Sequence, residues 1–450
     1  MNETRALAGF VAETQFADLP GGLVENCKIA VLDALGAGFV GTRQPWAQRI
    51  VAVVHDLGGS PAAAVIGHDW RTDVARAALV NGVLIGAFEC EPLTGSHASG
   101  TVLPAALAVA ERKRASGAAF ITALAVGFEV SARIARTAVG LETVRGFHNP
   151  GTQGPFGAAA AVGKLVGLDA ERLTDALGIA GSSSAGLLEF AWSGGDTKRL
   201  HLGRASQLGL ESALLARNGV RGPRSVLEGR SGYFNAFSTP PRLEKLLDGL
   251  RHKWAIEPPW LKSYPTHVTN QAVVEAIQGL KREHPLDPRR ITRVVIRGAP
   301  RIIEERHTAR APEDVLGGQY SLPFTTAVAL ARDLADPLAY NDEAVRDPLV
   351  RDLAQRIELM PLPEDAAHET PGVWRAEILI ECGTESRTLE TKSYKGSPLN
   401  PFTWPEACEK FRRYTTSMLG APRATAIIDA VEALERASNM ADVARLVASA

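Results

Sequence analysis

Apolar residues recur at helical spacing through most of the first half of the chain. Residues 5–40 and 46–57 predict amphipathic helices, because side chains three or four positions apart share one helix face. A more continuously apolar stretch, 73–93, predicts a buried helix that ends near Pro92, and residues 116–140 predict another. Alanine and glycine are frequent in these segments, which allows close packing. The pattern predicts an all-α bundle.

The pattern changes after about residue 255. Residues 291–300 alternate in the manner of a strand, and residues 373–393 predict two strands joined at Cys382-Gly383-Thr384. Residues 319–335 predict a helix, with Pro323 in its first turn. This part of the chain therefore predicts an α+β module.

The chain is predicted to be mainly α with three sequential parts. Residues 1–255 form an all-α domain, residues 256–398 form a smaller α+β lid, and residues 399–450 are helices that return to the helical domain. The 450 residues are enough for two domains and a large core. A junction between domains is a favoured place for a ligand pocket.

Candidate chemistry is concentrated in residues 145–223, where long helical patterns frame two polar loops. The first loop holds Arg145 and His148, and the second follows Gly194-Gly195 and contains Asp196, Thr197, Lys198, Arg199 and His201. Polar loops placed by a rigid scaffold are where binding and catalytic residues concentrate. The arrangement suits a pocket for a carboxylated metabolite, although each residue has the alternative interpretation of a solvated surface group.

Two further groups of polar residues stand near predicted helix ends or the junction. Glu89 and Glu91 precede His97, so a carboxylate could hold that imidazole in one tautomer. The segment LKSYPTH places Lys262, Tyr264 and His267 where the pattern changes. These residues could line the junction or remain structural.

Composition and net charge limit the kinds of partner that this protein is expected to bind. The formal net charge is −1, with no basic stripe, which argues against nucleic acid or an anionic membrane as the main partner. The first residues lack the pattern of a secretory leader, and no apolar run has the length of a membrane span. The balance of 45% apolar and 22% charged residues is ordinary for soluble proteins. A cytoplasmic protein that binds a small molecule is expected.

Motifs for the common cofactors are missing. Cys27, Cys90, Cys382 and Cys408 are scattered rather than clustered, unlike the ligands of zinc or iron–sulfur sites. The stretch from Gly157 departs from a phosphate loop in its spacing, and no dinucleotide, zinc-protease or serine-hydrolase motif is complete. We therefore expect no metal and no cofactor.

The chain as a whole resembles the 2-methylcitrate dehydratase (MmgE/PrpD) family, which includes cis-aconitate decarboxylase and iminodisuccinate epimerase. The resemblance is carried by collinear blocks along nearly the whole sequence: LVNGVLIGAFECE, SHASGTVLPAALAVAE, GFHNPGTQGPFGAAAAVGKLVGLDAERLTDALGIAGS, AGLLEF, TKRLHLGRASQLGLESALLARNG, LEGRSGYFNAF, LKSYPTH, QYSLPF and SYKGSPLNP.

The resemblance implies a helical domain with an α+β lid, a homodimer and a metal-free site between the domains. It implies that His97, His148, Lys198 and Lys262 are catalytic. The remaining candidates, which would bind the substrate, are Glu89, Arg199, His201, Tyr264 and His267.

Two positions depart from the family pattern. Glu89-Cys90-Glu91-Pro92 replaces an Asp-x-Asp-Asp motif, and Phe324 stands where some members carry tyrosine. The first interpretation of function is metal-free dehydration of a 2-methylcitrate-like tricarboxylate, with His148 as base and His97 as acid. The alternatives are decarboxylation or epimerisation of a related di- or tricarboxylate, and a non-catalytic binding protein that retains the fold.

Overall fold

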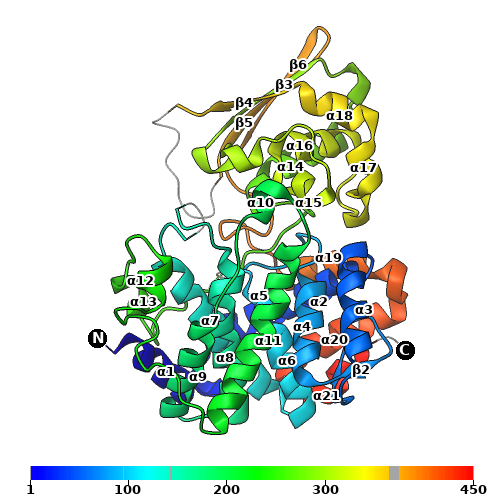
Figure 1. The fold of residues 1–450 in the computed structure, drawn as a ribbon. Helices are drawn as coiled ribbons and strands as arrows, with labels where there is room; N and C mark the ends of the chain where they lie inside the picture. The colour runs from blue at the N-terminus through cyan, green and yellow to red at the C-terminus, as the bar shows by residue number, and fades with distance from the viewer. Residues whose placement is uncertain (1, 95, 142–143, 257, 364–373, 449–450) are drawn as a thin grey trace.

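The computed structural model describes residues 2–94, 96–141, 144–256, 258–363 and 374–448. These residues form a helical bundle with a smaller sheet-containing part above it in Figure 1. The mainly α fold class predicted from the sequence is confirmed. The principal bundle helices are α1 (Glu3–Glu13), α2 (Gly21–Gly41), α3 (Pro45–Leu57), α4 (Val74–Ile85), α6 (Leu103–Lys113), α7 (Gly117–Thr137), α8 (Asn149–Val166), α9 (Ala170–Ser182) and α11 (Thr197–Arg217).

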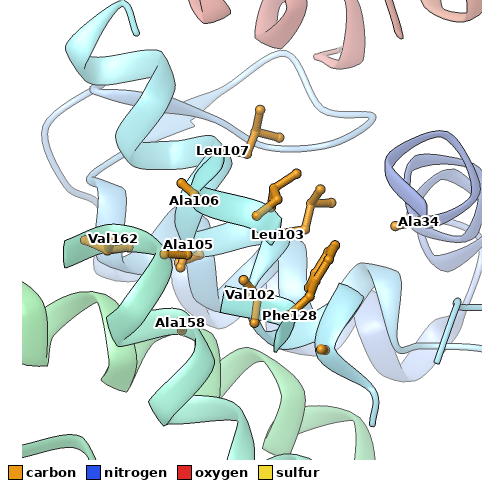
Figure 2. Packing of buried hydrophobic residues seen from close by; sticks show 14 of the residues in the cluster. Ala34, Val102, Leu103, Ala105, Ala106, Leu107, Phe128, Ala158 and Val162 are labelled. Atoms are coloured by element: carbon orange, nitrogen blue, oxygen red, sulfur yellow. The ribbon is translucent and has the colours of Figure 1, made fainter. Parts of the chain in front are cut away.

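Small residues let these helices approach closely. A side chain at Gly82 in α4 would lie 2.7 Å from Gly203 Cα in α11, a distance that real Cβ atoms do not show. Alanines such as Ala105 and Ala158 belong with Leu103 to one continuous hydrophobic core, part of which is drawn in Figure 2. Helices α8 and α11 therefore lie side by side, and both begin at the end of the bundle that faces the sheet.

Helix α7 corrects one expectation from the sequence. Its 21 residues are long and apolar enough to cross a membrane by length and composition alone. However, 83% of its most apolar window is buried inside the fold, so its apolarity is that of a core helix.

The sheet lies in the second part of the fold and has the strand order β4-β3-β5-β6. Its members are β3 (Arg293–Gly298), β4 (Ile357–Pro361), β5 (Ala376–Cys382) and β6 (Glu385–Thr391). Strand β5 pairs antiparallel with both β3 and β6, whereas β4 is parallel to β3. The β5–β6 hairpin and β3 confirm the predicted strands, and β4 was not predicted. The helices of this part are α14 (Gln271–Glu283), α15 (Val315–Tyr320), α16 (Leu322–Ala331), α17 (Asp342–Arg346) and α18 (Pro348–Gln355).

The C-terminal helices pack on the bundle. They are α19 (Trp404–Leu419), α20 (Ala421–Glu432) and α21 (Met440–Val447). Helix α19 lies along α2, and α21 contacts α6. In Figure 1 these orange and red helices stand beside the blue N-terminal ones. Helix α19 thus comes close to the junction from a distant part of the sequence.

Two local predictions were wrong. The helix predicted over residues 73–93 ends at Ile85, because Gly86 stops it and the following residues turn into the junction. There Phe88 and Cys90 join the core of the sheet-containing part. The loop predicted over residues 229–237 contains a short helix, α12 (Tyr233–Phe237).

Candidate active site

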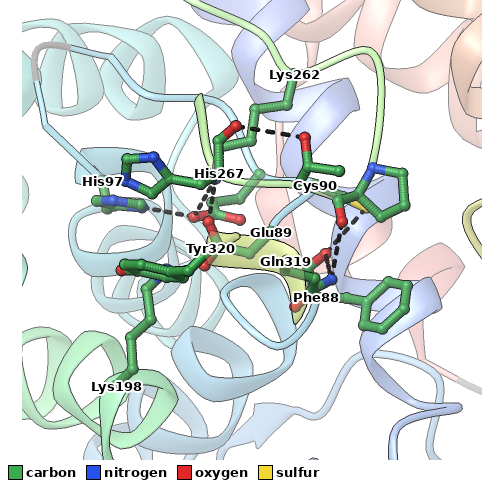
Figure 3. A network of polar contacts seen from close by, with 12 residues as sticks. Phe88, Glu89, Cys90, His97, Lys198, Lys262, His267, Gln319 and Tyr320 are labelled. Atoms are coloured by element: carbon green, nitrogen blue, oxygen red, sulfur yellow. Dashed lines mark hydrogen bonds and ion pairs between the residues drawn. The ribbon is translucent and has the colours of Figure 1, made fainter. Parts of the chain in front are cut away.

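A buried carboxylate joins the two predicted lysines. Glu89 forms ion pairs with Lys198 through Oε1 and with Lys262 through Oε2, the latter at 2.8 Å. All three side chains are at most 2% exposed. Lys198 stands in the first turn of α11, whereas Lys262 lies in the loop that enters the sheet-containing part. The junction therefore brings together three segments that are far apart in the sequence (Figure 3).

The backbone of Glu89 is strained. Its φ is +55°, a left-handed conformation that non-glycine residues seldom adopt. Such a conformation costs about 1–3 kcal/mol and persists where the surroundings hold it, most often at functional sites. The strain directs the Glu89 carboxylate towards the two ammonium groups.

Glu91 orients His97. Its Oε1 lies 2.5 Å from His97 Nδ1 and 3.4 Å from Lys262 Nζ. Burial favours the neutral acid, but Lys262 and His97 outweigh it and lower the pKa of Glu91 to about 2. Because the ionised carboxylate can only accept, His97 Nδ1 donates to it, which leaves Nε2 as the nitrogen that can exchange a proton.

His148 and His201 form the opposite side of the site. His148 precedes α8, and its ring centroid lies 6.0 Å from that of His97. The Nδ1 atoms of His148 and His201 are 3.1 Å apart, so one of them donates to the other. Burial lowers the pKa of His148 well below its usual range, and His97 and His201 lower it further. His148 is therefore a neutral base at physiological pH.

His267 belongs to a second aromatic group that the sequence did not reveal. It packs against Tyr320 and His307, with centroid distances of 4.7 and 4.6 Å. The Tyr320 ring in turn lies 4.7 Å from Lys198 Nζ. Tyr320 lies within the QYSLPF block that carries the family resemblance but was not among the predicted site residues, and His307 had no sequence signal.

We expect His307 to make the fold sensitive to acid. Burial lowers its pKa from 6.5 to about 4, so the unfolded chain binds the proton more readily between these values. The stabilisation is complete above pH 6.5 and is lost as the pH falls towards 4, by about 2 kcal/mol between pH 7 and pH 5. In the His307→Gln variant, urea unfolding at the two pH values should show a loss smaller by about that amount. An unchanged pH dependence would contradict this assignment.

Two predicted residues do not join the group. The Arg199 guanidinium lies 4.2 Å from the Trp46 ring centroid, and its Nε donates to Ala87 O at 2.9 Å. Tyr264 is buried in the core of the sheet-containing part, where its hydroxyl lies near Glu275 and an arginine. Neither residue lines the cavity beside the histidines, and their role in substrate binding stays a prediction. Phe324 is also fully buried.

A cavity of about 470 Å³ opens beside the histidines. His97 and His267 stand on its wall together with Asn149 and Arg301, and apolar side chains such as Trp260 and Trp374 are interspersed with these polar groups. A concave cavity that combines apolar side chains with polar groups able to orient a ligand is typical of a small-molecule site. The buried lysines lie behind these histidines rather than on the wall itself.

The site has the residues for proton transfer near a carboxylated ligand. A neutral imidazole can take a proton from carbon, an imidazolium can give one to it, and lysines can stabilise the negative charge that develops on carboxylate oxygens. Among the described residues, no group of three or more His, Cys, Asp or Glu side chains could hold a metal ion. We therefore expect activity to survive dialysis against EDTA, and an assay before and after dialysis tests this. Loss of activity that zinc or iron restores would contradict it.

Comparisons with known proteins identify the family of this chain. The MmgE/PrpD N-terminal domain matches residues 5–246, and the MmgE/PrpD C-terminal domain matches residues 264–436. Cis-aconitate decarboxylase of Mus musculus is 27% identical over 99% of this chain and 93% of its own length. That of Aspergillus terreus is 28% identical over 96% and 92%, and the cis-aconitate decarboxylase-like protein oryM of Aspergillus oryzae is 26% identical over 99% and 97%. With both family domains matched in order along a helical and a sheet-containing part, the chain belongs to the MmgE/PrpD family.

Proposed function

We propose that this protein is a metal-independent lyase that decarboxylates a cis-aconitate-like tricarboxylate. The observation that carries the proposal is the pair His97 and His148, 6.0 Å apart between ring centroids, beside the buried Lys198–Glu89–Lys262 group. The names of the relatives support the choice of reaction, since several that match nearly the whole chain are cis-aconitate decarboxylases.

In this reaction a carbon–carbon bond to one carboxylate breaks and CO₂ leaves. The electron pair stays on the remaining skeleton, where it is delocalised towards another carboxylate, and a carbon atom accepts a proton. Lys198 and Lys262 would stabilise the charge on the carboxylate oxygens. His97 is the proposed acid, because the Glu91 carboxylate at 2.5 Å from Nδ1 fixes the orientation of its ring.

Dehydration of a 2-methylcitrate-like substrate is the second candidate. It needs a base for a proton beside a carboxylate and an acid for the leaving hydroxyl. The neutral, buried His148 suits the base and His97 suits the acid. Lys198 is an alternative base, because burial lowers its pKa well below the usual range and Lys262 lowers it further.

One NMR experiment separates these reactions. The protein is incubated in heavy water with cis-aconitate, 2-methylcitrate and related di- and tricarboxylates. Loss of CO₂ with deuterium added to carbon supports the first proposal, and loss of water supports dehydration. Exchange or stereochemical change without either indicates epimerisation. Binding of these acids without any reaction would overturn the assignment of an enzyme and leave a binding protein.

Location and assembly are further proposals. All four cysteines are free, and three of them are buried, which suits a reducing compartment such as the cytoplasm. The homodimer implied by the family resemblance stays a prediction, which sedimentation velocity tests.

A further inference from the structure

A buried lysine from the C-terminal helix α19 reaches the back of the site. Lys410 is 2% exposed, and its Nζ lies 2.6 Å from Asp33 Oδ1 in α2, which is equally buried. The same ammonium group donates to Cys90 O at 3.3 Å. Cys90 stands between Glu89 and Glu91, so Lys410 binds the backbone that carries both site carboxylates.

The next turn of α19 reaches the second segment of the site. Tyr414 follows Lys410 by four residues and therefore lies on the same helix face. Its ring centroid is 5.0 Å from Lys410 Nζ, and its hydroxyl donates to Ser263 O at 3.5 Å. Ser263 is the neighbour of Lys262. One face of α19 thus contacts both the Glu89–Glu91 turn and the Lys262 segment.

The Glu89–Glu91 turn is held by buried side chains from several elements. The carbonyl of Ala87 accepts from Arg199 and Trp46, and that of Phe88 accepts from Gln319 at 3.2 Å. These contacts hold the backbone before Glu89, the residue with the left-handed conformation. Lys410 holds the backbone directly after it, because its charged ammonium group donates to the Cys90 carbonyl. A non-glycine residue keeps a left-handed backbone conformation only when the surrounding structure holds it in place. These hydrogen-bond donors hold the backbone on both sides of Glu89.

Stability alone does not explain a buried ion pair at this place. The desolvation of both charges offsets most of their attraction, and a pair of apolar side chains would often stabilise the fold as well or better. The Lys410–Asp33 pair has a second contact, the Cys90 carbonyl, which an apolar pair could not make.

We propose that Lys410, with Asp33 as its counter-ion, is a positioning residue of the active site. It holds the Glu89–Glu91 turn so that Glu89 meets both lysines and Glu91 meets His97. It does not touch the cavity. Its effect on turnover rests on the proposed function, but its effect on the geometry of the turn does not.

The test compares Lys410→Met with the double variant Asp33→Asn/Lys410→Met. The single variant leaves a buried carboxylate without its partner, so we expect a large fall in Tm. The double variant has no buried charge at this place, and its Tm should return close to the wild type. Its kcat should nevertheless stay about 30-fold lower or more, with a smaller change in KM, since a displacement of 1 Å in a site can cost about 100-fold. The control is Lys28→Met in α2, the helix that also carries Asp33; it removes a partly buried ion pair to Glu435 and should leave kcat unchanged.

A readout without substrate keeps this test separate from the identity of the reaction. The Nδ1 proton of His97, assigned by its loss in His97→Asn, reports the hydrogen bond to Glu91. We expect its resonance to move or exchange faster in the double variant and to stay in place in Lys28→Met. That result supports the positioning role even if no polycarboxylate proves to be a substrate. A double variant with wild-type Tm, wild-type kcat and an unmoved His97 signal would overturn it and show a structural ion pair only.

Discussion

Replacing Lys198 with methionine is expected to lower kcat/KM by at least about 100-fold. A charge-assisted hydrogen bond is worth about 1.5–3 kcal/mol, and more where it tightens in the transition state of a water-poor site. Methionine keeps most of the aliphatic volume next to Tyr320. The Tm should change little, because Glu89 keeps Lys262 at 2.8 Å and is not left as an unpaired buried charge. Steady-state kinetics and calorimetry measure both quantities.

The control for Lys198→Met is Lys164→Met in α8. Lys164 is a partly buried lysine that donates to Ala12 O far from the junction, so turnover should not change. Lys198→Arg should restore only part of the activity, because a planar fork does not replace a compact ammonium group. If Lys198→Met stays within a few-fold of the wild type, the charge-stabilising role must move to Lys262.

Replacing His97 with asparagine is expected to lower kcat by about 100- to 10,000-fold, the usual contribution of one acid–base group. Asparagine can still donate to Glu91, so the buried carboxylate keeps a partner and the fold should persist. The variant lacks Nε2, the ring nitrogen that is proposed to transfer the proton. If His97 is the acid, the variant should also lose the limb of the pH–rate profile that reports a protonated group.

His68→Asn is the matched control, because His68 is half-buried and its Nδ1 contacts Ile66 O at 2.8 Å, away from the junction. Glu91→Gln should give an intermediate loss, since it keeps a hydrogen-bond acceptor for His97 Nδ1 but makes that hydrogen bond weaker by removing the negative charge. A His97→Asn variant with nearly full turnover and an unchanged pH–rate profile would exclude His97 as the acid. His148 would then be the first residue to test in its place.

Local pattern was sufficient for much of the fold. Helical periodicity predicted most of the bundle, and alternation predicted β3 and the β5–β6 hairpin, because these signals depend on neighbours within one element. Local pattern did not predict the ends or the presence of elements that depend on packing against segments distant in the sequence. Helix α4 ends at Ile85 because Phe88 and Cys90 enter another core, and β4 forms because β3 offers it a parallel partner.

For the site, the sequence by itself determined which residue types were available and, through family resemblance, that His97, His148, Lys198 and Lys262 belong together. Only the tertiary structure decided where each side chain points. Lys198 and Arg199 are neighbours, yet consecutive helix positions diverge by about 100°, so one meets Glu89 and the other meets Trp46. Lys410 lies far from the other site residues in sequence, and no local pattern could assign it to Cys90. Contacts across such separations arise only when the packed core brings the segments together.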